Sequence, residues 1–187
     1  MTAPAKHGAR RIDALLIGAS AGGIDALLRI LPGLAPDCGF PVVIVLHLPD
    51  DRASRLAEVF GQHLALPVRQ AEDKAELQAG CVYFAPPGYH LSIENEGCFS
   101  LSQEDPVHFS RPAIDVLMAS AADAYGAQAC GIVLTVAAGA AGGLTAVQDP
   151  LEAEIATMPN AAIRLRAPDL VLNLAALRAL LASLKGA

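Results

Sequence analysis

Ser20 is the first residue whose type and setting suggest chemistry, because it stands in the Gly-x-Ser-x-Gly pattern of LLIGASAGGIDALL, Leu15 to Leu28. Glycines between a strand and a helix can bind a phosphate, but the dinucleotide fingerprint needs glycine at the position of Ser20, and no Walker lysine follows. The same pattern forms a nucleophile elbow, a tight strand-to-helix turn that raises the serine hydroxyl above the sheet edge. Ser20 could instead cap the helix that begins near Ile24. The pentapeptide alone does not separate the last two roles.

His47 bears on this choice, because a serine hydroxyl attacks only when a base removes its proton. The predicted strand Val42–Leu48 ends in VLHLPD, and open α/β sheets place ligands at the carboxyl ends of their strands. Ser20 and His47 are therefore expected at the ends of neighbouring strands. The other histidines belong to the N-terminal tail, a helix end or loops: His7, His63, His90 and His108. The pairing favours Ser20 as a nucleophile with His47 as its general base.

Short apolar runs alternate with helical patterns along the chain. The runs fit buried strands of a covered parallel sheet: Ala14–Ile17, Val42–Leu48, Val82–Ala85, Ile132–Val136, Leu144–Val147 and Leu170–Leu172. The helical patterns lie between several of them: Ile24–Leu31, Ala53–Leu64, Pro112–Tyr125, Met158–Leu165 and Leu174–Leu184. We predict an α/β fold with a doubly wound, mostly parallel sheet flanked by helices. The stretch Cys81–Gln103 has Pro-Pro-Gly and Asn-Glu-Gly turns and predicts a small antiparallel β meander attached to the main sheet.

The composition limits the class of protein. A chain of 187 residues with 53% hydrophobic and 17% charged residues can bury one core, so we expect one domain, residues 13–187, after an N-terminal tail of residues 1–12. The net charge of −6, with 13 basic residues spread along the chain, argues against nucleic-acid binding. The tail lacks a secretory apolar segment, which predicts a cytoplasmic protein. The cysteines lack metal-binding or redox spacing and are expected to be buried thiols: Cys38, Cys81, Cys98 and Cys130.

No charged residue occurs between Asp123 and Asp149, a length that could span a membrane. The segment is rich in glycine and alanine, whose preference for the bilayer is far weaker than that of Leu, Ile, Phe or Val. Buried strands are the better interpretation, and we expect no direct membrane insertion.

The order of several motifs resembles one known family. The motifs IGASAGG, VLHLPD, VYFAPPGYH, HFSRPAIDVLMASAA, GIVLT, TAVQDP and MPNAAI follow one another as in the catalytic domain of the chemotaxis protein-glutamate methylesterases, the CheB-type methylesterases. The resemblance implies hydrolysis of glutamate γ-methyl esters with release of methanol, often with deamidation of receptor glutamines. The partners it implies are methylated chemoreceptor cytoplasmic helices and a receiver domain, which could act here in trans. It implies no metal or organic cofactor.

The resemblance also assigns roles by position. It implies Ser20 as the nucleophile, His47 as the general base and Ala21 as a residue whose backbone N–H helps to hold the oxyanion. Arg111, in the Ser-Arg-Pro segment, is expected either near the active-site cleft or in an ion pair at the start of the helix after Pro112.

The sequence departs from the family after GIVLT, where the family places its catalytic aspartate in a glycine-rich loop followed by a helix. Here VAAGAAGG leads directly to LTAVQDP, and no Asp or Glu precedes Asp149, which is more typical of a turn residue before Pro150 than of a replacement acid. Residues 137–143 are too few for a helical crossover, which predicts a displaced strand, a hairpin or a frayed turn. Two functions therefore stay open: a methylesterase whose activity is impaired by the missing acid, and a catalytically degenerate module that binds receptors or other signalling partners.

Overall fold

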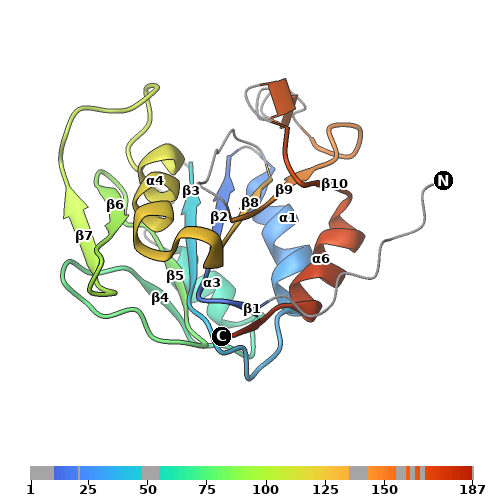
Figure 1. The fold of residues 1–187 in the computed structure, drawn as a ribbon, viewed down its shortest axis with the longest axis horizontal. Coiled ribbons are helices and arrows are strands. Elements are labelled where there is room, and N and C mark those ends of the chain that lie inside the picture. The colour runs from blue at the N-terminus through green and yellow to red at the C-terminus, as the bar shows by residue number, and fades with distance from the viewer. Residues whose placement is uncertain are drawn as a thin grey trace.

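The centre of the molecule is a sheet of seven parallel strands in the order β10-β9-β8-β2-β3-β5-β4 (Figure 1). Its strands are β2 (Ala14–Ala19), β3 (Val42–Leu46), β4 (Val68–Gln70), β5 (Val82–Phe84), β8 (Ala129–Val133), β9 (Leu144–Gln148) and β10 (Leu170–Leu172). The computed structural model describes residues 11–20, 22–47, 55–134, 143–154, 159–160, 163–164 and 167–186. The seven-stranded parallel sheet confirms the predicted α/β class.

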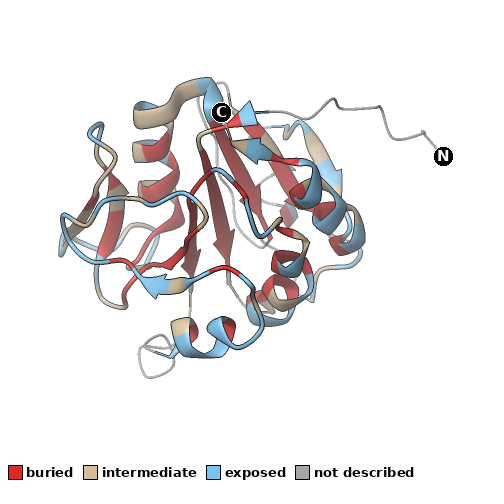
Figure 2. Cartoon of the chain, turned by 90° about the horizontal axis from the view of Figure 1, so that it is seen from below, coloured by how far each residue is buried: buried red, intermediate tan, exposed pale blue. Residues whose placement is uncertain are grey.

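Strand β2 shows why the sheet is covered on both faces. All six of its residues are buried, and they alternate between two cores, with Leu15 and Ile17 in one and Ala14 and Leu16 in the other. The first core is covered by α1 (Gly23–Ile30), α3 (Leu56–Gly61) and α6 (Leu174–Ser183), and the second by α4 (Ile114–Tyr125). Figure 2 shows the central strands buried along their length. A continuous apolar run is what a strand covered on both faces requires.

A second, two-stranded antiparallel sheet consists of β6 (His90–Ile93) and β7 (Phe99–Ser102). The predicted meander was correct about these strands and wrong about their attachment, because β6 and β7 are not hydrogen-bonded to the seven-stranded sheet. They pack against α4 instead, where the Ile93 N–H donates to the Ser120 hydroxyl at 3.0 Å. Strand β5, at the start of the same stretch, belongs to the main sheet.

The connection between β8 and β9 corrects another prediction. The two strands pair in parallel, with Cys130 opposite Leu144, so they do not form a hairpin. Strand β8 begins at Ala129, three residues before the predicted start at Ile132, and ends at Val133. The connection therefore spans residues 134–143, close to the roughly ten residues that a parallel crossover needs. Residues 135–142 lie outside the described part of the chain.

The remaining elements complete the layers. Single-turn 3-10 helices η1 (Leu31–Gly33) and η2 (Gly126–Gln128) follow α1 and α4. Strand β1 (Arg11–Ile12), within the residues expected to form the tail, pairs with β11 (Lys185–Gly186) near the C-terminus. Of the predicted helix Met158–Leu165, the structure describes residues 159–160 and 163–164, which are helical. Among the described residues, no helix is both long and apolar enough to cross a membrane.

Candidate active site

Ser20 and His47 lie at the carboxyl ends of neighbouring strands. Strand β2 pairs with β3 up to Ala19 opposite Leu46, and Ser20 and His47 directly follow the two strands. The His47 N–H donates to the carbonyl of Ala19 at 2.9 Å, so the parallel pairing continues to the residue before the serine. Parallel strands lie about 4.8 Å apart. The structure thus brings together the two residues that the sequence singled out.

The turn after Ser20 leads directly into α1. The Gly23 N–H donates to the Ser20 carbonyl at 2.7 Å, and Gly22 has a φ of 77°, a left-handed conformation that favours glycine. Gly22 occupies the N-cap position, and no side chain caps the helix. The alternative in which Ser20 is the N-cap is therefore wrong. Ala21, to which the resemblance gives an oxyanion role, lies outside the described residues.

A second feature restricts this turn. A Cβ atom at position 22 would lie 2.6 Å from Oε2 of Glu154. The segment that follows β9 therefore packs against the start of α1. It is held there by Glu152, whose carboxylate lies 3.6 Å from the Arg29 guanidinium and accepts the backbone N–H of Leu174.

The start of α4 covers the end of β2. A Cβ atom at Gly18, two residues before Ser20, would lie 2.6 Å from Cγ2 of Ile114, the first residue of α4. Only a glycine permits this approach without displacement. The close packing fixes Ile114, and with it the preceding Pro112, above the strand ends that carry Ser20 and His47.

The surroundings of His47 favour its neutral form. Burial lowers the pKa of His47 below its usual 6.5, and two smaller effects oppose it: a hydrogen bond to the backbone carbonyl of Pro112 and the negative charge of Asp115. Nε2 of His47 is buried and has no hydrogen-bond partner among the described residues. At neutral pH the ring is therefore unprotonated and able to accept a proton, as a general base must.

Arg111 organises the loop before α4. One of its guanidinium nitrogens donates to the carbonyls of Gln103 and Glu104, both at 3.0 Å. In the part of the chain that the structure describes, Arg111 forms no ion pair, so the predicted ion pair at the helix start is not found. The same loop places Phe109, with a φ of 63°, fully in solvent.

The Asp149 side chain stabilises a turn and does not act on His47. Its Oδ1 accepts the N–H of Leu151 at 2.9 Å, which is typical of an aspartate in a turn. The acidic residue near His47 is instead Asp115, in the first turn of α4. Sequence reasoning missed Asp115, because no spacing between motifs links the start of α4 to the end of β3.

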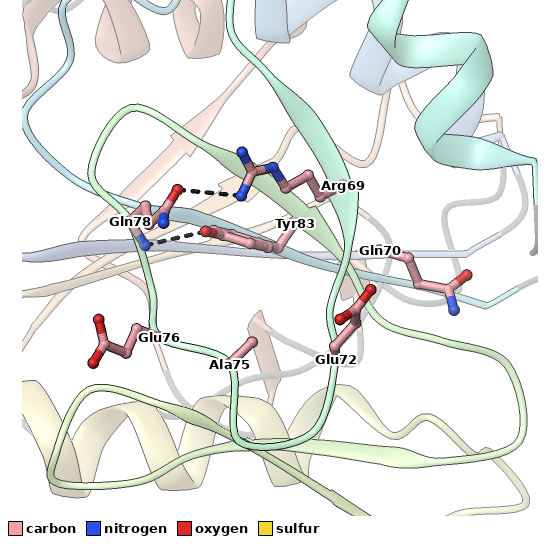
Figure 3. A pocket seen from close by; sticks show the side chains of 7 residues that line it. All are labelled: Arg69, Gln70, Glu72, Ala75, Glu76, Gln78 and Tyr83. Atoms are coloured by element: carbon pink, nitrogen blue, oxygen red, sulfur yellow. Dashed lines mark hydrogen bonds between the residues drawn. The ribbon is translucent and has the colours of Figure 1, made fainter.

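A polar pocket of about 420 Å³ lies elsewhere, along β4 and β5 (Figure 3). In it Arg69 donates to the side-chain oxygen of Gln78 at 3.2 Å, and the backbone N–H of Gln78 donates to the Tyr83 hydroxyl at 3.1 Å. Its lining residues include no serine, cysteine or histidine. Its lining therefore holds no serine–histidine or cysteine–histidine pair, in contrast to the ends of β2 and β3.

Comparison with known proteins gives this geometry its context. A family described as CheB methylesterase matches residues 15–181. A relative from Leptospira interrogans is 43% identical over 172 residues, 87% of this chain and 89% of its own length. A protein-glutamate methylesterase/protein-glutamine glutaminase from Anaeromyxobacter dehalogenans is 40% identical over 91% of this chain and 52% of its own length.

A solved structure shows the same architecture. The catalytic domain of Thermotoga maritima CheB methylesterase superposes with a TM-score of 0.84 at 28% identity, covering 92% of this chain and 98% of that domain. The fold, the motif order and the extent of the sequence match agree. The chain belongs to the CheB methylesterase family, whose named members are carboxylic ester hydrolases.

Proposed function

We propose that this chain is a protein-glutamate methylesterase of bacterial chemotaxis. Its substrates are glutamate γ-methyl esters on chemoreceptor cytoplasmic helices, and its products are the glutamate carboxylate and methanol. The observation that carries the proposal is the register of β2 and β3, which puts Ser20 beside His47 at the carboxyl edge of the sheet. Glutamine deamidation follows from the same chemistry, with ammonia as the leaving group.

The reaction proceeds through an acyl-enzyme. The Ser20 hydroxyl oxygen attacks the ester carbonyl carbon while His47 takes the hydroxyl proton, which gives a tetrahedral oxyanion near the positive end of the α1 dipole. The intermediate collapses as protonated His47 gives its proton to the methoxy oxygen, so that methanol leaves and Ser20 carries the glutamyl acyl group. Water then attacks the acyl carbon with His47 again as base, which releases the carboxylate and restores the serine hydroxyl.

The electrostatics of the site support this assignment. A base must be unprotonated at working pH, and burial keeps the pKa of His47 below 6.5. The lone pair of a buried, unpartnered Nε2 has no competing donor among the described residues. Gly18 lets the start of α4 approach the end of β2, and Gly22 allows the tight turn that leads from Ser20 into α1.

The experiment is methanol release from a methylated receptor cytoplasmic fragment. The purified wild-type chain is expected to release methanol, and Ser20→Ala is expected to lose at least about 10³-fold in kcat/KM. Ser100→Ala, in the small antiparallel sheet, is the matched control and should behave as wild type.

Two outcomes would contradict the proposal. Turnover unchanged by Ser20→Ala would remove Ser20 from the mechanism. No methanol release by the wild type, together with binding to the receptor fragment, would favour the second function: a degenerate module that binds receptors. The missing acid after β8 is the observation in favour of that module. Addition of a phosphorylated receiver domain to the assay tests regulation in trans.

A further inference from the structure

We propose that Asp115 is the anion that stabilises protonated His47, the part that the aspartate plays in a Ser-His-Asp triad. The inference rests on the proposed function of Ser20 and His47 and names the acid that their chemistry lacks after β8. The triad acid stabilises the imidazolium that forms when the serine proton is transferred. A carboxylate on another element can serve the same purpose when the fold brings it to the imidazole.

The packing of α4 brings Asp115 to this position. Ile114 contacts Gly18 so closely that no side chain fits between helix and strand, and the Pro112 carbonyl accepts a hydrogen bond from the His47 ring. These two contacts lie on either side of the start of α4. Asp115, the second residue of the helix, follows at once, so its carboxylate is tied to the same turn of backbone that touches His47.

The charges around the site single out Asp115. It is the charged group among the described residues whose field acts on His47, and it acts in favour of the protonated ring. Asp115 also lies beside the exposed side chain of His108. The distance from Nε2 of His108 to Oδ2 of Asp115 is 3.9 Å. Arg111, in the same loop, points its guanidinium at two backbone carbonyls.

Within the described part of the chain, the neighbouring elements offer no equivalent acid. Asp25, in the first turn of α1, lies 3.8 Å from the guanidinium of Arg29. Glu154 lies beside Gly22, on the α1 side of the turn. Neither carboxylate contributes to the pKa of His47.

Asp115 also suits the first turn of a helix, where a negative charge interacts favourably with the macrodipole. That structural role predicts a loss of stability on substitution and no change in the titration of His47. The electrostatic role predicts that the titration of His47 itself changes. The pH dependence of the His47 ring therefore distinguishes the two roles.

The experiment compares Asp115→Asn with the wild type and with Asp123→Asn, an exposed acid further along the same helix. The His47 ring resonance, assigned with His47→Gln, is followed by NMR as a function of pH. In Asp115→Asn it should titrate at lower pH than in the wild type, and in Asp123→Asn at the wild-type position. Asp115→Glu, which keeps the charge, should restore most of the difference.

Kinetics supply the second readout. Asp115→Asn should lower kcat for methanol release about tenfold or more with KM little changed, because a triad aspartate acts in the transition state. Identical His47 titrations in Asp115→Asn and wild type would overturn the inference. If the titration shifts while the wild type releases no methanol, the pairing of Asp115 with His47 stands and the proposed methylesterase function fails.

Discussion

Gly18→Ala tests the contact that positions the site. A Cβ atom at this position would lie 2.6 Å from Cγ2 and 3.0 Å from Cδ1 of Ile114, whereas carbon atoms pack best at about 3.5 to 4.0 Å. Ile114 is 1% exposed, so it cannot turn into solvent, and the start of α4 has to retreat by about 1 Å. Overpacking of this kind costs about 1–3 kcal/mol. We expect Gly18→Ala to lower the free energy of unfolding by that amount.

Equilibrium urea unfolding, followed by circular dichroism, measures the effect. Gly61→Ala is the matched control, because nothing lies within 4 Å of its added Cβ and the residue ends α3. It should be neutral or stabilising by up to about 1 kcal/mol. In a double-mutant cycle, Ile114→Ala removes the atoms that the new methyl group meets. The double variant should be more stable than the sum of the single losses predicts, by about 1 kcal/mol or more.

Equal unfolding midpoints and slopes for Gly18→Ala and wild type would refute the reasoning, because the added methyl group would then fit without displacement. The same substitution should also reduce methanol release by the folded protein. The retreat of α4 moves the Pro112 carbonyl and Asp115 together away from His47. A destabilised variant with full activity would show that the helix start does not position the base.

Three further predictions concern the base, the surface and the last helix. Burial holds the pKa of His47 below 6.5, and only the neutral ring accepts a proton. We therefore expect kcat/KM to be constant at higher pH and to fall as the pH drops through a value below 6.5. A fall in kcat/KM that begins above pH 6.5 would contradict the assignment of His47 as the base. Phe109→Ala should raise KM for a receptor fragment several-fold and leave a small ester substrate unaffected, because an exposed aromatic residue is a typical anchor for a protein partner. The Asn173 side chain is the N-cap of α6 and accepts the N–H of Ala176 at 2.8 Å. Asn173→Ala should therefore lower the free energy of unfolding, measured in urea, by about 1 kcal/mol. An unchanged unfolding midpoint would show that the cap does not contribute to stability.

The sequence predicted those elements whose residue pattern is contained in one short stretch of the chain. Apolar runs such as Val42–Leu48 predicted the buried strands, and the rule that ligands gather at the carboxyl ends of strands placed Ser20 beside His47 before any coordinates. Strand β4 was missed because only Val68 of its three residues is apolar, as expected for an edge strand. The start of β8 was placed late because Ala129 and Gly131 have low strand propensity.

The relations that the sequence did not predict depend on long-range packing. The nearness of Asp115 to His47 requires a glycine under Ile114 and a loop tied by Arg111, and no spacing along the chain encodes either. The separation of β6 and β7 from the main sheet depends in the same way on their packing against α4. The acid of the site was therefore sought near its place in the family pattern, whereas the fold supplies one from a distant segment.

The contact between Gly22 and Glu154 bears on attempts to change what this protein accepts. The left-handed backbone at position 22 disfavours any larger residue, so variant libraries should keep this glycine constant. Diversity belongs at position 154, whose side chain is exposed and borders the nucleophile turn. Selection there samples the rim of the site while the backbone that presents Ser20 is left intact.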